Sequence, residues 1–296
     1  MTEKYFVGLD MGTTGAKTII FNMNGEPVGS GYREYGCYYP HPTWVEQDVD
    51  EMTVALFETC KDAIADAKIN PNDILPLLKD LGVQHHSQPA TISITQSTEV
   101  GTVYTIAEIK TITNLAHQYG MKVHMDGARI SNAAVALNMP FRSFTVDAGI
   151  DILSFGGTKN GMMMGEAVLL FNQPSESSIR FVRKQCTQLY SKMRFISAQF
   201  LAYFENERWK RNAEHANRMA QLLATELSMI EQVKFTHKTE ANGVFISIPS
   251  EIIVKLREHH NFYEWDSTPT IRLVTSFDTT EDDVNHFIKT LKKLLK

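Results

Sequence analysis

Lys159 is the residue whose type and position most directly suggest covalent chemistry. It follows the apolar run 151–155 and lies between Gly156-Gly157 and Gly161. A lysine held at the end of a strand can form a Schiff base with an aldehyde when desolvation favours its neutral amine. Asn160-Gly161 is also a common turn pair, so the segment is equally typical of a plain hairpin with a solvated lysine. Both interpretations stay open for this segment alone.

Asp126 is the second candidate, because it ends the predicted strand 121–125. Acids at the carboxyl ends of strands face the crevice where α/β sheets bind ligands. The alternative role is capping of the helix that follows. Arg129, three residues later, can bind a carboxylate or phosphate through two nitrogens, and its alternative is a surface ion pair.

Arg272 lies inside the apolar predicted strand 270–275. A charge in such a strand needs a partner, which favours binding of a ligand or a carboxylate. His124 shares a strand face with Asp126, two residues away. It could approach a ligand there, but a hydrogen-bonded core histidine is the favoured interpretation.

A separate candidate site lies near the start of the chain, in Asp10-Met-Gly-Thr-Thr-Gly15. An acid at a strand end followed by a turn of small hydroxyl residues and glycines can offer hydroxyls and amides to phosphate, while the acid holds Mg²⁺ through water. The alternative is an ordinary glycine-rich hairpin.

The elements that must position these residues change in character along the chain. The first seventy residues predict a small β-rich unit followed by one helix, with Asn24-Gly25 as a hairpin turn. From residue 75 strands and helices alternate, as in α/β layered folds. Thr105 and Glu108 predict a capping box, and Thr280 to Asp283 opens a final helix. The predicted strands are 90–94, 121–125, 151–155, 166–171, 244–248 and 270–275, and the predicted long helices are 177–208 and 212–227.

Composition narrows the function classes. The 296 residues carry 29 basic and 34 acidic side chains, a formal net charge of −5, which argues against a nucleic-acid or anionic-membrane surface. The three cysteines are far apart and form neither a CxxC metal pair nor a disulfide framework, so we expect a reducing compartment and no metal site. The N-terminus shows no signal-peptide pattern, and the apolar runs are too short to span a bilayer. We therefore expect a soluble, cytoplasmic globular protein.

Residues 3 to about 73 resemble the start of a kinase family. The stretch YFVGLDMGTTGAKTIIFNMNGEPV, followed by PTWVEQDVDEM, is similar to the FGGY carbohydrate kinases, such as xylulokinase. The resemblance implies a ribonuclease-H-like hairpin and helix fragment, with Asp10, Thr13 and Thr14 contacting the phosphates of ATP. The family's catalytic aspartate and second ATPase lobe have no match in the remainder of the chain.

Residues 75–296 resemble a different family. Five ordered motifs, QHHSQPATISITQSTEVGTVYT, VHMDGARISNAAVALN, DILSFGGTKNGMMMGEAVLLF, KMRFISAQF and IRLVTSFDTT, are similar to low-specificity threonine aldolases of the β-eliminating lyase group. The resemblance implies pyridoxal phosphate as cofactor on the aspartate-aminotransferase fold (fold type I). It also implies that the N-terminal third of such an enzyme, with its glycine-rich phosphate loop and ring-stacking histidine, is replaced by residues 1–74.

The aldolase resemblance gives each candidate residue a role. Lys159 would form the Schiff base and Asp126 would face the pyridine nitrogen. Arg129 and Arg272 would hold the substrate carboxylate, and Arg194 would reach the cofactor phosphate across a subunit interface, which implies a homo-oligomer (dimer or tetramer). The implied reaction cleaves L-threonine or a related β-hydroxy-α-amino acid to glycine and an aldehyde.

These resemblances predict an α/β chain in three parts. Residues 1–74 form the kinase-like fragment, 75–210 part of the fold type I large domain, and 211–296 a small C-terminal α/β domain. Two alternatives to an aldolase-like lyase stay open: a non-catalytic chimera, and a kinase fragment that binds ATP phosphate.

Overall fold

The computed structural model describes strands 5–11, 15–22 and 27–34 and residues 68–79, 81–85, 88–171, 177–265 and 269–296. The chain divides into two compact units, which are described separately. The first comprises Met1–Pro76 with Thr98–Val100, and the second comprises Leu77–Ser97 with Gly101–Lys296.

The first unit contains a three-stranded antiparallel sheet. Its strands are β1 (Tyr5–Met11), β2 (Gly15–Asn22) and β3 (Pro27–Glu34), in that order across the sheet. A short helix, α2 (Pro71–Ile74), begins at Asn70, whose side chain accepts a hydrogen bond from the Asn72 amide. Asp10 lies in β1 opposite Lys17. Thr13, Thr14 and the predicted helix after residue 48 lie outside the described residues.

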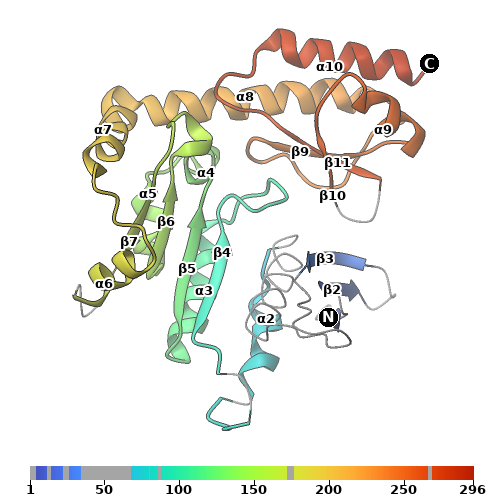
Figure 1. Ribbon diagram of the computed structural model, residues 1–296. Helices are drawn as coiled ribbons and strands as arrows, with labels where there is room; N and C mark the ends of the chain where they lie inside the picture. The colour runs from blue at the N-terminus through green and yellow to red at the C-terminus, as the bar shows by residue number, and fades with distance from the viewer. Residues whose placement is uncertain are drawn as a thin grey trace, which may run out of the picture. The chain divides into compact units, whose positions relative to one another are not determined.

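The second unit holds a four-stranded mixed sheet in the order β4-β5-β6-β7. Strands β4 (Thr91–Thr95), β5 (Lys122–Gly127) and β6 (Ile152–Gly156) are parallel, and β7 (Glu166–Leu170) runs antiparallel to β6. The parallel crossovers place α3 (Ile106–Gln118), α4 (Ile130–Leu137) and α5 (Phe141–Phe144) on one face of the sheet (Figure 1). This is the mixed α/β sheet expected for part of a fold type I domain.

Local sequence explains how α3 forms and packs. The Thr105 side chain accepts from the Glu108 amide while the Glu108 carboxylate accepts from the Thr105 amide, which confirms the predicted capping box. The buried side of the helix carries Ile109, Ile112 and Ala116, spaced three or four residues apart.

The single helix predicted over 177–208 is wrong, because the chain breaks there twice. Helix α6 (Ser177–Gln185) is followed by Thr187 at φ +58°, and α7 (Met193–Phe204) by Asn206 and Glu207 at φ +51° and +54°. Left-handed backbone cannot continue an α-helix, so the chain turns sharply before α8 (Arg208–Ser228) (Figure 1).

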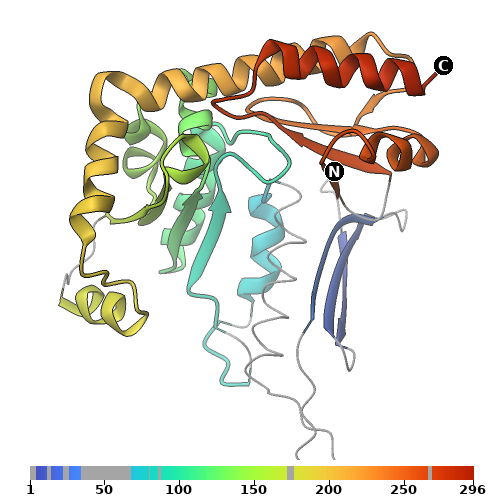
Figure 2. The same ribbon diagram turned by 45° about the horizontal axis from the view of Figure 1, so that its top comes forward.

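Helix α8 connects the first sheet with a second one. It continues from α7 past α4 to the antiparallel sheet β10-β11-β9-β8, where it lies beside α10 (Glu281–Leu294) (Figure 2). The second sheet consists of β8 (Lys234–Phe235), β9 (Gly243–Ser247), β10 (Tyr263–Trp265) and β11 (Thr270–Val274), with α9 (Ser250–Arg257) between β9 and β10. Apolar residues of α8, both central strands, α9 and α10 form one buried core: Leu223, Leu227, Val244, Ile246, Leu256, Ile271, Phe287 and Leu291. Among the described residues, no helix is long and apolar enough to cross a membrane.

Candidate active site

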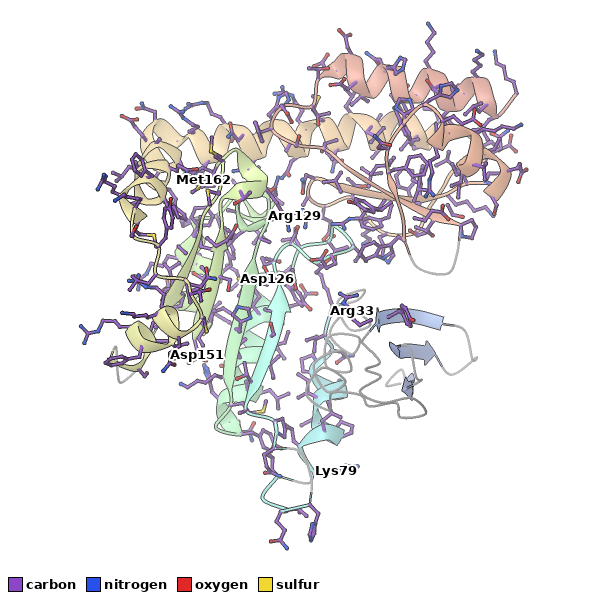
Figure 3. All side chains as sticks on the ribbon, viewed as in Figure 1. Arg33, Lys79, Asp126, Arg129, Asp151 and Met162 are labelled. Atoms are coloured by element: carbon purple, nitrogen blue, oxygen red, sulfur yellow. The ribbon has the colours of Figure 1, made fainter. Side chains whose placement is uncertain are left out.

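Asp126 and Lys159 lie at the same edge of the first sheet. Asp126 pairs with Ser154 near the end of β5, and Lys159 lies in the 3-10 turn Thr158–Asn160 that follows β6. Because β5 and β6 are parallel, their carboxyl ends meet at this edge. Figure 3 shows Asp126 and Arg129 there.

Asp126 organises the start of α4 without being its N-cap. Its Oδ1 accepts a hydrogen bond from the Ala128 amide at 2.9 Å. The N-cap position belongs to Arg129, which makes no side-chain capping bond. Asp126 therefore fixes the turn that carries Arg129, while its second carboxylate oxygen is not part of that hydrogen bond.

Glu166 joins Asp126 and Lys159 and was not selected from the sequence. It starts β7, directly opposite Gly156 in the antiparallel register with β6. Its carboxylate accepts hydrogen bonds from the hydroxyl and the backbone amide of Thr158 and interacts electrostatically with Lys159 and Asp126. Burial of the carboxyl raises its pKa and the Asp126 charge acts in the same direction, whereas Thr158 and Lys159 act against them.

Gly156 makes this close approach possible. A Cβ atom at this position would lie 2.7 Å from the Ala128 Cα and 2.9 Å from the Glu166 Oε2. The Glu166 residue as a whole is exposed, but its carboxyl end lies over this glycine, which accounts for the desolvation of the acid. Only a residue without a side chain fits between Ala128 and the Glu166 carboxylate.

The residue after Lys159 is anchored from the other side. Asn160 is buried, and its Nδ2 donates to the Tyr203 hydroxyl at 2.6 Å and to the Trp209 carbonyl at 2.8 Å. Its own carbonyl accepts from the Asn212 Nδ2 at 2.9 Å. These bonds tie the turn to α7 and α8.

The connection that carries Lys159 retains features of the plain hairpin considered as the alternative, and the lysine itself is exposed. Strands β6 and β7 do pair antiparallel on either side of it, as in a hairpin. The linking residues 157–165 contain the 3-10 turn, which ends at Gly161 with φ +103°. A non-glycine residue would be strained in that conformation.

Three arginines selected from the sequence lie on three different elements. Arg129 lies beside Asp126 at the sheet edge (Figure 3). Arg272 lies in β11 of the second sheet, with its guanidinium 4.9 Å from the Trp265 ring centre and 5.9 Å from that of Phe245. Arg194 is exposed on α7, 5.1 Å from the ring centre of Phe195.

His124 has the hydrogen bonds of a structural residue. Its Nδ1 lies 2.8 Å from the Ser93 hydroxyl, and its Nε2 lies 3.0 Å from the Ser154 hydroxyl. The ring therefore bridges β4, β5 and β6, which confirms the favoured interpretation of a hydrogen-bonded histidine.

Ser97 adds a polar group near the same edge. The preceding Gln96 amide donates to the Asp126 carbonyl at 2.8 Å, so the chain beyond β4 runs beside Asp126. The Ser97 hydroxyl is buried and, within the described part of the chain, has no hydrogen-bond partner. A buried hydroxyl without a hydrogen-bond partner lowers the stability of the fold, so the Ser97 hydroxyl is a candidate contact for a bound ligand. Nothing in the sequence distinguishes this serine from others.

Asp151 marks the opposite end of the sheet and belongs to the scaffold (Figure 3). Its carboxylate binds His117 Nε2 at 2.8 Å, Lys122 Nζ at 3.0 Å and the Val123 amide at 2.9 Å. Burial alone would raise the pKa of Asp151, but these hydrogen bonds outweigh it and lower the pKa.

Comparison with known proteins supports the sequence motifs on which the site was selected. The family model "Beta-eliminating lyase" matches residues 38–249. A low-specificity L-threonine aldolase from a Pseudomonas species is 40% identical over 212 residues, covering 71% of this chain and 61% of that protein. A threonine aldolase structure from Leishmania major has a TM-score of 0.71 at 27% identity, covering 77% of this chain and 68% of that one.

A second relative belongs to another class. A glycerol kinase from Trichodesmium erythraeum is 38% identical over 73 residues, which cover 25% of this chain and 14% of the kinase. The chain thus combines a kinase-like segment with a longer aldolase-like one, as the motifs predicted. It spans 61% of the length of the Pseudomonas aldolase.

Proposed function

The chain belongs to the β-eliminating lyase family, and on this premise we propose that residues 75–296 act as a threonine-aldolase-type lyase. The proposed reaction cleaves L-threonine or a related β-hydroxy-α-amino acid to glycine and an aldehyde. The observation that carries the proposal is the meeting of Asp126, Lys159 and Glu166 at one sheet edge, within motifs similar to those of threonine aldolases.

Family membership implies pyridoxal phosphate as the cofactor, and the polar groups at the sheet edge fit it. Lys159 offers a primary amine for the cofactor aldehyde, Asp126 a carboxylate for the pyridine nitrogen, and Ser97 a buried hydroxyl in need of a partner. When bound, pyridoxal phosphate supplies the electron sink for cleavage of the Cα–Cβ bond.

Each side chain then has a defined task in the proposed site. Asp126 would keep a proton on the ring nitrogen, and Lys159 would hold the cofactor through its amine. Arg129 and Arg272 bind the substrate carboxylate and so fix the orientation of the substrate.

Arg194 is proposed to contact the cofactor phosphate of a neighbouring subunit in a dimer or tetramer. The support is the exposure of Arg194 on α7, together with exposed apolar side chains on α6 and α7. Phe181 is 64% exposed, Phe195 59% and Leu201 75%, an apolar content more typical of an interface than of a free surface. A cytoplasmic location is part of the same proposal.

Reductive trapping tests the function most directly. The purified chain is mixed with pyridoxal phosphate, reduced with borohydride and digested, and we expect a pyridoxyl group on Lys159. Lys159→Arg should abolish the label. Lys238→Arg changes an exposed lysine between β8 and β9 and should retain the label. Release of glycine and acetaldehyde from L-threonine should follow the same pattern. A chain that carries no label on Lys159 would end this proposal.

The glycerol kinase similarity supports two alternatives: a non-catalytic chimera, and a kinase fragment in which residues 1–74 bind nucleotide phosphate through Asp10, Thr13 and Thr14. In the chimera, the large-domain portion is residues 75–210 and the small domain is residues 211–296. Neither part catalyses a reaction. Calorimetry with Mg-ATP should give binding heat, and its absence at millimolar nucleotide would exclude the phosphate site.

Single-molecule sequencing across codons 60–90 of the source would decide whether the junction is natural.

A further inference from the structure

Glu166 is an acid that neither the family comparison nor the sequence motifs assign a task. Glu166 begins β7, the strand that follows the turn with Lys159. The antiparallel register of β6 and β7 brings it opposite Gly156, which lies two residues before Thr158. Its carboxylate accepts from both the hydroxyl and the amide of Thr158, the residue that precedes Lys159. The acid therefore holds the first residue of the turn that carries the lysine.

Several features of the structure keep the Glu166 carboxylate in place. Gly156 leaves room for the carboxyl, which would lie 2.9 Å from a Cβ at that position. The carboxyl is partly desolvated, although the Glu166 stem is exposed. A desolvated carboxylate is unfavourable unless its hydrogen bonds and charge partners compensate, and Thr158 and Lys159 provide them.

The charges around Glu166 have a definite pattern. Lys159 stabilises its anion, whereas Asp126 of β5 opposes it, and Tyr203 of α7 also lies within electrostatic range. Interaction energies between charges are mutual, so the Glu166 anion favours the ammonium form of Lys159 by the same amount. Neutralising Glu166 must then make the lysine a better nucleophile at a given pH.

We propose that Glu166 is a positioning residue for Lys159, holding the lysine-bearing turn through Thr158 and placing a carboxylate near the lysine amine. The inference rests on the proposed role of Lys159, but its test needs no cofactor. Failure of the cofactor trap and failure of this coupling are therefore separate results.

Competitive acetylation with trace acetic anhydride measures the reactivity of Lys159 against pH. After acetylation, residues 143–180 form one tryptic peptide, because they contain no other lysine or internal arginine. In Glu166→Gln, which keeps the size and acceptor oxygen of the side chain, Lys159 labelling at pH 8 should rise about threefold, because the lysine loses a nearby negative charge that favours its ammonium form. Lys238 serves as the internal reference and should not change.

Two further variants separate charge from mere structure. Glu231→Gln removes an exposed acid after α8 and should leave the Lys159 profile unchanged. Glu166→Asp keeps the negative charge and should restore most of the wild-type profile. A Lys159 profile that is the same in wild type and Glu166→Gln would overturn the proposal.

A measurement on the wild-type chain covers the case in which Glu166→Gln fails to fold. A water-soluble carbodiimide activates a carboxyl, which a neighbouring amine attacks to form an amide as the carbodiimide leaves as its urea. We expect such a bond between Glu166 and Lys159, seen as the loss of one water from peptide 143–180. Absence of that crosslink would overturn the proposed proximity of the two charged groups.

Discussion

Removal of the Tyr203 hydroxyl tests the anchor of the lysine-bearing turn. Tyr203 is 2% exposed, and its hydroxyl accepts from the Asn160 Nδ2 at 2.6 Å and lies 2.7 Å from the Ser131 Oγ. Burial raises the pKa of this phenol, so it is neutral at physiological pH. Tyr203→Phe keeps the ring and deletes both hydrogen bonds.

The magnitude follows from what each partner does afterwards. Ser131, buried in the first turn of α4, loses the 2.7 Å contact between its Oγ and the Tyr203 hydroxyl. Asn160 is 3% exposed and keeps its bond to Trp209, but one N–H stays buried without an acceptor. One unsatisfied buried donor costs about 1–3 kcal/mol, so we expect a loss of about 2 kcal/mol in the free energy of unfolding.

Urea and thermal unfolding, followed by circular dichroism, provide the assay. A loss of about 2 kcal/mol corresponds to a melting temperature lowered by about 4–8 °C for a unit of this size. Tyr263→Phe is the matched control, because that tyrosine is 75% exposed and should change stability by less than about 0.5 kcal/mol.

A Tyr203→Phe chain as stable as the Tyr263→Phe control would refute the anchoring role. Combination with Ser131→Ala refines the result, since residues that share a hydrogen bond should show a coupling of about 0.5–1.5 kcal/mol. The reductive trap on Lys159 should also lose yield in Tyr203→Phe, because the turn is less well fixed.

Three more predictions concern the scaffold and the site edge. The pKa of Asp151 is lowered in the folded chain, so its contribution to stability is present above its unfolded pKa of about 3.9 and is lost as pH falls through the folded value. Asp151→Asn should remove this acid-induced loss of stability, measured by unfolding between pH 2 and 6. Gly156→Ala should destabilise the chain by about 1–3 kcal/mol, because the new methyl meets the backbone of Ala128, and unchanged urea midpoints would contradict the close approach. His124→Asn should lower stability by about 1 kcal/mol yet leave trapping on Lys159 intact; a lost label would assign His124 to the cofactor instead.

Local sequence was sufficient for features that depend on neighbours in the chain. The capping box at Thr105 was predicted from residues three positions apart, and it forms. The predicted start of the last helix at Thr280 is also confirmed, with a capping box to Asp283. The buried stripe of the last helix, from Val284 to Leu291, follows from its helical spacing alone. The breaks after α6 and α7 were missed because helical periodicity continues through them, whereas the left-handed residues Asn206 and Glu207 carry no glycine signal.

By itself the sequence determined the two families that the chain combines and the order of the motifs around Asp126 and Lys159, because such motifs are contiguous. The tertiary structure alone decided that Glu166 joins them, since only the register of β6 and β7 sets it opposite Gly156. It also decided that Asn160 is held by Tyr203, which is 43 positions away along the chain. The roles of Arg129, Arg194 and Arg272 stay predictions. Contacts between distant residues depend on strand register and helix packing, which no short motif encodes.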